Sequence, residues 1–268
     1  MIATALLFLP TYLASGFTTT PAFLEKRFDK MTRSMVSGLF LFGYVTVLLP
    51  VVLYTGSLAL ITMFDLNISI WLVAAAIGTL GSSYAIFGGL KSIVKVTSNL
   101  VPSMVALYFI MGIFILISNS EAIIPTFRLI LKEAFNLETA VTGGFWGLVI
   151  LGVRRAVFSN ETGVGNAPMY HGQSQSSKGT DEGLVAMLGP LFDTILVCTI
   201  TGLIVIISGA HQMPNLNGIV LTLEAFRRLF FGFGDQLLLL MVFVFGISTL
   251  FTYSYYGVKC FGFLTQKK

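Results

Sequence analysis

The chain has 268 residues, of which 55% are hydrophobic and only 10% are charged, and its formal net charge is +4. Its mean hydropathy is +0.87, and a charged fraction so far below the usual value of about 25% excludes an ordinary soluble domain. The composition indicates a protein that lies in a lipid bilayer, and its basic residues are explained below by membrane topology, so nucleic-acid binding is not expected.

Apolar runs follow one another along the whole chain. A helix needs about 20 mostly apolar residues to cross a hydrocarbon core of about 30 Å, and the first run is too short, since it covers only about 20 Å. A signal peptide is the alternative for that run, but MIATALLFLP lacks a basic start. The seven runs lie near residues 2–14, 34–63, 68–90, 99–118, 141–157, 183–208 and 235–257. They predict an all-α polytopic membrane protein with six full transmembrane helices and a truncated one.

The basic residues are distributed unevenly between the predicted loops. Lys and Arg accumulate in short cytoplasmic loops. If the first run heads inward, the outside receives only Arg128, Lys132, Arg227 and Arg228 of the 16 basic residues. The inside receives Lys26, Arg27, Lys30, Arg33, Lys91, Lys95, Arg154, Arg155, Lys178, Lys259, Lys267 and Lys268. This bias predicts an external amino terminus in a multi-pass plasma-membrane protein, such as one of a bacterial inner membrane.

Residues 141–157 open with a glycine-rich segment, Thr142-Gly143-Gly144-Phe145-Trp146-Gly147. Glycines weaken a helix and let backbone polar groups face a ligand. The alternative is close helix packing in lipid. Phe145 and Trp146 are candidates either for the walls of a pocket or for an aromatic belt at the membrane interface.

Other polar residues fall inside predicted spans. Asp193 lies near the centre of run 183–208, where a carboxylate handles protons or ions or makes a structural hydrogen bond. Ser248 and Thr249 either find partners on other helices or bond back to their own helix. Thr249 and Tyr253 are four residues apart and share one helix face. No His, Cys or carboxylate cluster has the spacing of metal ligands, so we expect neither an enzyme nor a cofactor.

Three motifs carry a family resemblance. From about residue 87 onward, GVRRAVFSNETGVGNAPMYHG, EGLVAMLGPLFDTILVCTITGLIVIISG and STLFTYSYYG closely resemble the alanine or glycine:cation symporter family. TTTPAFLEKRFDKMTRSMVSGLFLFGYVTVLLPVVLYTGSLAL and SSYAIFGGLK resemble the sodium:solute symporter family instead. We therefore interpret residues 1–268 as one transmembrane domain with a chimeric sequence, in which residues 1–86 come from the second family and 87–268 from the first.

The resemblance implies a partial LeuT-type core, built from inverted repeats. The truncated run corresponds to the end of core helix 2 and the six full spans to helices 3 to 8, which leaves helices 1, 9 and 10 outside the chain. The implied function is symport of a small neutral amino acid, alanine or glycine, with sodium as the coupling ion. Because helix 1 contributes to both sites in these families, we expect no coupled transport by the chain alone. The alternatives are a sodium:solute symporter for sugars or organic acids and an inert membrane fragment.

The resemblance also assigns residues to sites. It implies that Ser248 and Thr249 bind sodium, while Thr249 and Tyr253 border the substrate. The family usually has a tryptophan at the position of Tyr253, so the size of the pocket differs here. Residues 141–157 correspond to a broken helix whose residues Gly143, Gly144, Phe145 and Trp146 face the substrate.

The charge bias gives a testable orientation. In a variant whose two cysteines, Cys198 and Cys260, are replaced by serine, Asn160→Cys is expected to react with an impermeant maleimide only after the cells are permeabilised. The matched variant Lys132→Cys is expected to react in intact cells. Labelling of position 160 in intact cells would contradict the orientation.

Overall fold

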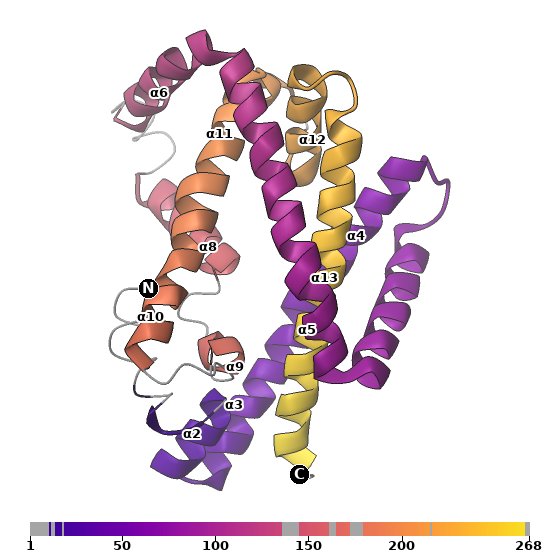
Figure 1. Ribbon diagram of the computed structural model, residues 1–268, viewed down its shortest axis with the longest axis vertical. Helices are drawn as coiled ribbons and strands as arrows, with labels where there is room; N and C mark the ends of the chain where they lie inside the picture. Colours follow the sequence, from indigo (N-terminus) through magenta and orange to yellow (C-terminus); the bar gives the residue numbers. More distant parts are fainter. Residues whose placement is uncertain are drawn as a thin grey trace. The chain divides into compact units, whose positions relative to one another are not determined.

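The structure is a computed structural model that describes residues 11, 14–17, 19–135, 145–160, 165–171, 179–214 and 216–265, and every element in these ranges is a helix (Figure 1). Four stretches are long and apolar enough to cross a membrane, and they are Lys30–Phe64, Val96–Ser118, Thr180–Ile207 and Gly234–Thr265. Ile70–Tyr84 is a shorter apolar stretch. These helices confirm an all-helical protein with several candidate spans, whereas most of run 2–14 lies outside the described residues.

The chain divides into two compact units, each made of two segments. The first unit comprises Met1–Arg33 and Asn119–Leu203, and the second comprises Ser34–Ser118 and Ile204–Lys268. The first unit contains α2 (Thr20–Arg27), α6 (Ser120–Ala134), α8 (Phe145–Asn160), α9 (Ala167–His171), α10 (Gly179–Pro190) and the π-helical η3 (Leu191–Val197). The second contains the π-helical η2 (Tyr44–Leu48), α4 (Leu49–Phe64), α5 (Ile70–Ser118), the 3-10 helix η4 (Ala210–Gln212), α12 (Gly218–Leu229) and α13 (Gly234–Thr265). The chain passes between the units within α3 (Lys30–Gly43), after α5, and within α11 (Cys198–Ile207).

α13 is the central helix of the second unit, and α4, α5 and α12 pack against it. Its glycine Gly246 faces Gly56 of α4 so closely that a Cβ at position 246 would lie 3.7 Å from the Cα of Gly56. On the other neighbour, the side chain of Leu250 occupies the space above Gly81 of α5. Small residues therefore let the backbones of these helices approach each other, as is common among helices in lipid.

The sequence predicted a loop between runs 68–90 and 99–118, whereas the structure assigns helix to this whole stretch. The backbone continues as one helix, α5, of 49 residues, with Pro102 inside it. Lys91 and Lys95 indicate contact with water, but a lysine does not by itself end a helix. Ends are produced by residues that offer the backbone other partners or forbid the helical geometry. The chain changes direction within α5 (Figure 1), so its two parts correspond to the two predicted runs and not to one straight helix.

A tight turn joins α12 to α13. Phe231 and Gly232 adopt positive φ angles of 35° and 75° and reverse the chain. Beside the turn, the Glu224 carboxylate accepts hydrogen bonds from Arg228 and pairs with Arg227, at 2.8 and 2.7 Å. These contacts, led by the bond from Arg228, lower the pKa of Glu224. The turn thus seats the last part of α12 against the first residues of α13.

Gly234, the first residue of α13, has no room for a side chain. A Cβ there would lie 2.6 Å from the Phe226 carbonyl oxygen and 2.7 Å from the Phe230 Cβ. We expect Gly234→Ala to destabilise the protein by about 1–3 kcal/mol, because backbone atoms must move. The measurement is reversible unfolding in detergent, followed by circular dichroism.

The matched control is Gly202→Ala in α11, where the added Cβ meets no described atom within 4 Å. This substitution is expected to be neutral or to stabilise the protein by up to about 1 kcal/mol, through helix propensity. Equal stabilities of the two variants would show that the α12–α13 turn is not tightly packed.

Candidate functional site

The glycine-rich candidate segment is only partly covered by the structure. Gly143 and Gly144 lie outside the described residues. The backbones of Phe145 and Trp146 begin α8, but their side chains also lie outside what is described. Their predicted role at a substrate pocket therefore stays a prediction.

Ser248 is placed in the buried middle of α13. Its side chain is 6% exposed, and its Oγ donates a hydrogen bond to the Phe245 carbonyl oxygen at 2.9 Å. This is the bond back to the same helix that the sequence left open as an alternative. A hydroxyl that donates its proton in this way keeps its oxygen lone pairs, which are the electrons that a cation needs. The hydrogen bond is thus compatible with a sodium ligand at Ser248.

Tyr253 lies in a cluster of buried tyrosines. Its ring centroid is 5.7 Å from that of Tyr44 and 6.1 Å from that of Tyr256, and all three residues are at most 5% exposed. Tyr44 begins the π-helical segment η2, and short π-helical segments are frequent at functional sites. Sequence reasoning missed Tyr44, although it is an aromatic residue with a polar group in the middle of an apolar run. The cluster fixes the position of the Tyr253 ring, one turn from Thr249.

Asp193 lies in the second π-helical segment, η3. Its carbonyl oxygen accepts the N–H of Cys198, five residues later. α8 packs against this segment, so within the first unit the structure brings the helix that follows the glycines together with the helix that carries Asp193. Ser248, Thr249 and Tyr253 belong to the second unit.

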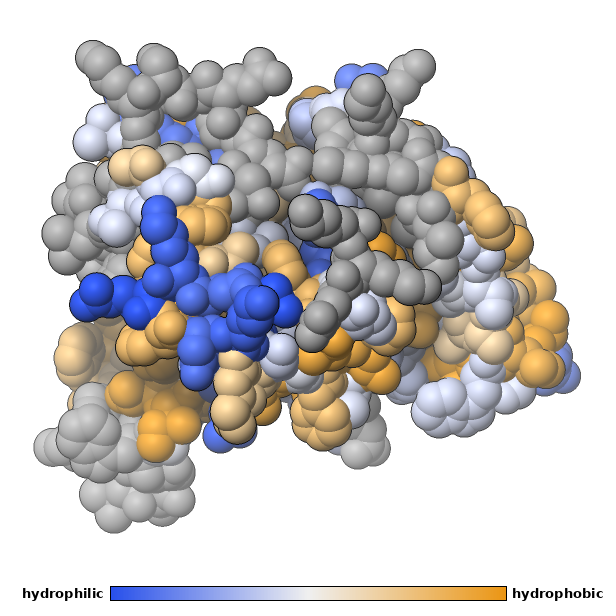
Figure 2. All heavy atoms as spheres, turned by 90° about the horizontal axis from the view of Figure 1, so that it is seen from below, coloured by the Kyte–Doolittle hydropathy of each residue, from blue (hydrophilic) through white to orange (hydrophobic). Residues whose placement is uncertain are grey.

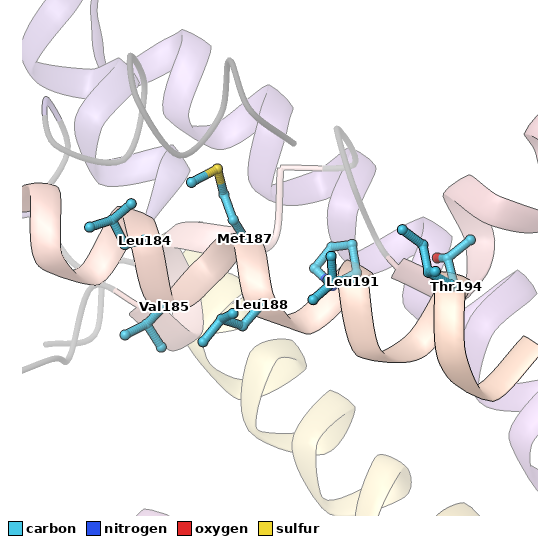
Figure 3. Close-up of a pocket in the computed structure, with 8 residues that line it drawn as sticks. Leu184, Val185, Met187, Leu188, Leu191 and Thr194 are labelled. Carbon is cyan, nitrogen blue, oxygen red and sulfur yellow. The ribbon is translucent and has the colours of Figure 1, made fainter.

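A groove of about 740 Å³ follows α10 and η3 (Figure 3). It is lined by Leu184, Val185, Met187, Leu188, Pro190, Leu191, Thr194 and Ile195. Thr194 contributes the one side-chain hydroxyl of this lining, and no charged side chain belongs to it. An amino acid carries an ammonium and a carboxylate that need polar partners when they leave water. This groove therefore fits hydrocarbon and not an amino acid.

Polar contacts link short helices and loops within the first unit. The His171 Nδ1 lies 2.5 Å from a carboxylate oxygen of Glu182 and joins α9 to α10. Thr20 donates a hydrogen bond to the Gly165 carbonyl oxygen at 2.7 Å. Among the described residues, no group of three or more His, Cys, Asp or Glu side chains is arranged to hold a metal ion. These contacts tie the segment after SNETG to α2 and α10.

The described helices, four of which are long and apolar enough to cross a membrane, define an all-helical, polytopic membrane protein. A family model described as the sodium:alanine symporter family matches residues 16–268. The chain belongs to the sodium:alanine symporter family. This is a family of transporters and not of enzymes.

Several relatives agree with this family. The chain is 39% identical over 186 residues to the sodium/alanine symporter AgcS of Methanococcus maripaludis, a match that covers 68% of this chain and 41% of the relative. It is 32% identical over 258 residues to the probable sodium/glutamine symporter GlnT of Bacillus subtilis, covering 95% of this chain and 53% of that protein. It is 31% identical over 197 residues to the amino-acid carrier protein AlsT of the same organism, covering 74% and 42%. The chain thus spans about half the length of these relatives or somewhat less.

The comparisons do not support the chimera. One family model runs from residue 16 to residue 268, and the match to GlnT covers 95% of the chain. A second family is therefore not required to account for residues 1–86.

Proposed function

We propose that this chain forms part of a sodium-coupled symporter for small neutral amino acids, with alanine or glycine as the substrate. The observation that carries the proposal is the match of one symporter family to residues 16–268. Relatives named as sodium/alanine and sodium/glutamine symporters support both the coupling ion and the class of substrate. We further propose a LeuT-type arrangement of inverted repeats in a plasma membrane, such as a bacterial inner membrane.

In this proposal Ser248 and Thr249 supply oxygen ligands to sodium. Ser248 is buried and Thr249 is partly buried, and hydroxyls on a membrane helix are suited to this role because sodium sites in such transporters are built from oxygens near the bilayer midplane. Inward sodium flow supplies about 2.3 kcal/mol per charge for each 100 mV of membrane potential. Asp193, a carboxylate in the candidate span Thr180–Ile207, is the proposed second group that handles an ion or a proton, with a structural hydrogen bond as the alternative.

The proposed substrate contacts are Thr249 and Tyr253 in α13 and, from the glycine-rich segment, Gly143, Gly144, Phe145 and Trp146. The close packing of Tyr253 against Tyr44 supports a rigid wall at this position, because both rings are almost fully buried. A rigid wall favours small side chains such as those of alanine and glycine. A sugar or an organic acid gains no support from the relatives.

The proposal is tested by placing this chain in the matching segment of a longer relative. The segment of the M. maripaludis sodium/alanine symporter that aligns with this chain is replaced by the matching residues of this chain, and uptake of labelled alanine into proteoliposomes is measured. We expect uptake to rise severalfold with an inward sodium gradient, whereas the chain alone is expected to be inactive. Equal uptake with and without the gradient would contradict sodium coupling, and no uptake by a folded exchange protein would favour the inert fragment.

The sodium ligands are tested in the same exchange protein. Ser248→Ala with Thr249→Val removes both hydroxyls and is expected to raise the sodium concentration for half-maximal uptake at least tenfold, since a lost ligand costs on the order of 1.4 kcal/mol or more. The control is Tyr253→Trp, which is expected to change the preference between alanine and larger amino acids without changing the response to sodium. Unchanged sodium dependence in the first variant would remove the ion-ligand role.

A further inference from the structure

Exposed apolar side chains are common on this protein, as on the face that Figure 2 shows. Many of them belong to the candidate spans, whose surroundings are lipid. The helix α6 also exposes apolar side chains, but it is not a candidate span. It has 15 residues, so at about 1.5 Å per residue its length of about 22 Å is less than a hydrocarbon core of about 30 Å. The apolar surface of α6 therefore needs a different explanation.

The apolar face of α6 points away from the protein. Ile124, Phe127 and Leu131 are 64%, 43% and 57% exposed, and Phe135, directly after the helix, is 81% exposed. Their spacing of three or four residues puts these four residues, the outer face of α6, on one side of the helix. Thr126, about 200° around the helix from Ile124, is 7% exposed. A surface helix of a soluble protein packs its apolar face on the core, whereas α6 has the reverse arrangement, and the described residues leave its outer face largely uncovered.

Charged side chains border the outer face. Arg128 and Lys132 are exposed and lie one turn apart along the same edge of the helix. Long basic side chains can lie along an apolar surface and still place their charges in a polar layer. A helix with Phe and Leu on one face and Lys and Arg beside it is typical of the membrane interface. Glu121 and Glu133 balance the two cations, so α6 has no net charge and its binding depends on the outer face.

The order of the chain places the start of α6 at the membrane surface. The candidate span Val96–Ser118 ends directly before Asn119, and Asn119 is the N-cap of α6. Asn119 leaves the helical geometry, with φ of -121° and ψ of 33°. One residue extends the chain by at most about 3.6 Å. α6 therefore begins within one residue of the end of the span, whichever direction it then takes.

We propose that α6 lies in the lipid interface of one leaflet, with its outer face in the boundary between head groups and acyl chains and with Arg128 and Lys132 at the level of the phosphates. Interfacial helices of this kind sink about 5–10 Å into that boundary. A second protein copy would cover the outer face but would also have to supply partners for both cations, which phosphates and water supply at the interface. The site does not depend on the proposed transport function.

Spin labels measure the depth of α6 in the bilayer. In the variant whose Cys198 and Cys260 are serines, Leu131→Cys or Ile124→Cys is labelled with a nitroxide, and the full chain is reconstituted in phosphatidylcholine liposomes. The depth follows from collisions of the label with oxygen, which concentrates in lipid, and with a nickel chelate, which stays in water. We expect both labels about 5–10 Å below the phosphates. The matched control is Glu133→Cys, on the opposite side of α6, whose label is expected to meet the nickel chelate in water.

Two results would overturn the proposal. Equal collision rates with nickel at positions 131 and 133 would place α6 in water. Low collision rates with both reagents at positions 124 and 131 would mean that protein, such as a second copy, covers the outer face. Because two positions report on the same face, the comparison remains possible if one variant does not fold. Circular dichroism and gel filtration before reconstitution identify the folded variants.

Discussion

A polar group in hydrocarbon must find its partner within the protein, since an unpaired one costs several kcal/mol. This constraint explains why every described element is a helix, in which backbone groups pair along the same segment. It also acts on side chains. The hydroxyls of Thr46, Thr55 and Thr62 all donate to a carbonyl oxygen four residues earlier, at 2.6 to 2.7 Å. Ser248 follows the same rule, since its Oγ donates to the Phe245 carbonyl oxygen at 2.9 Å, and the proposed sodium role uses the oxygen lone pairs that this bond leaves open.

The sequence predicted most of the apolar helices because the length that crosses a bilayer is a property of composition alone. Between residues 90 and 99 it predicted a loop, whereas the structure is helical there and the chain changes direction within α5 (Figure 1). The backbone of the candidate site was predictable only in part. Ser248 and Tyr253 stood out as polar groups in an apolar run, but their neighbour Tyr44 is brought to them by tertiary packing, which no local pattern records. The two-family interpretation was wrong because it rested on short motifs, whereas a single family matches residues 16–268.

The division into two units shows why the sequence pattern of a single segment does not predict how the chain packs. Each unit is assembled from two segments that are separated in the sequence, and α3 and α11 pass from one unit into the other. The small residues between α13 and its neighbours, such as Gly246 against Gly56, set how closely the second unit can pack. The proposed sodium ligands therefore rest on a helix whose position is fixed by contacts to α4 and α5.

The π-helical segments have a further consequence for how the chain tolerates insertions and deletions. η2 and η3 each lie inside a continuous helical stretch, and a π-helical turn holds about one residue more than an α-helical turn. Loss of one residue from Tyr44–Leu48 would let the stretch close into a regular α-helix, but each residue corresponds to about 100° of rotation. All of α4 would then turn relative to α3, and Gly56 would no longer face Gly246. A length change of a single residue, harmless in a loop, would here separate the central helix of the second unit from its partner.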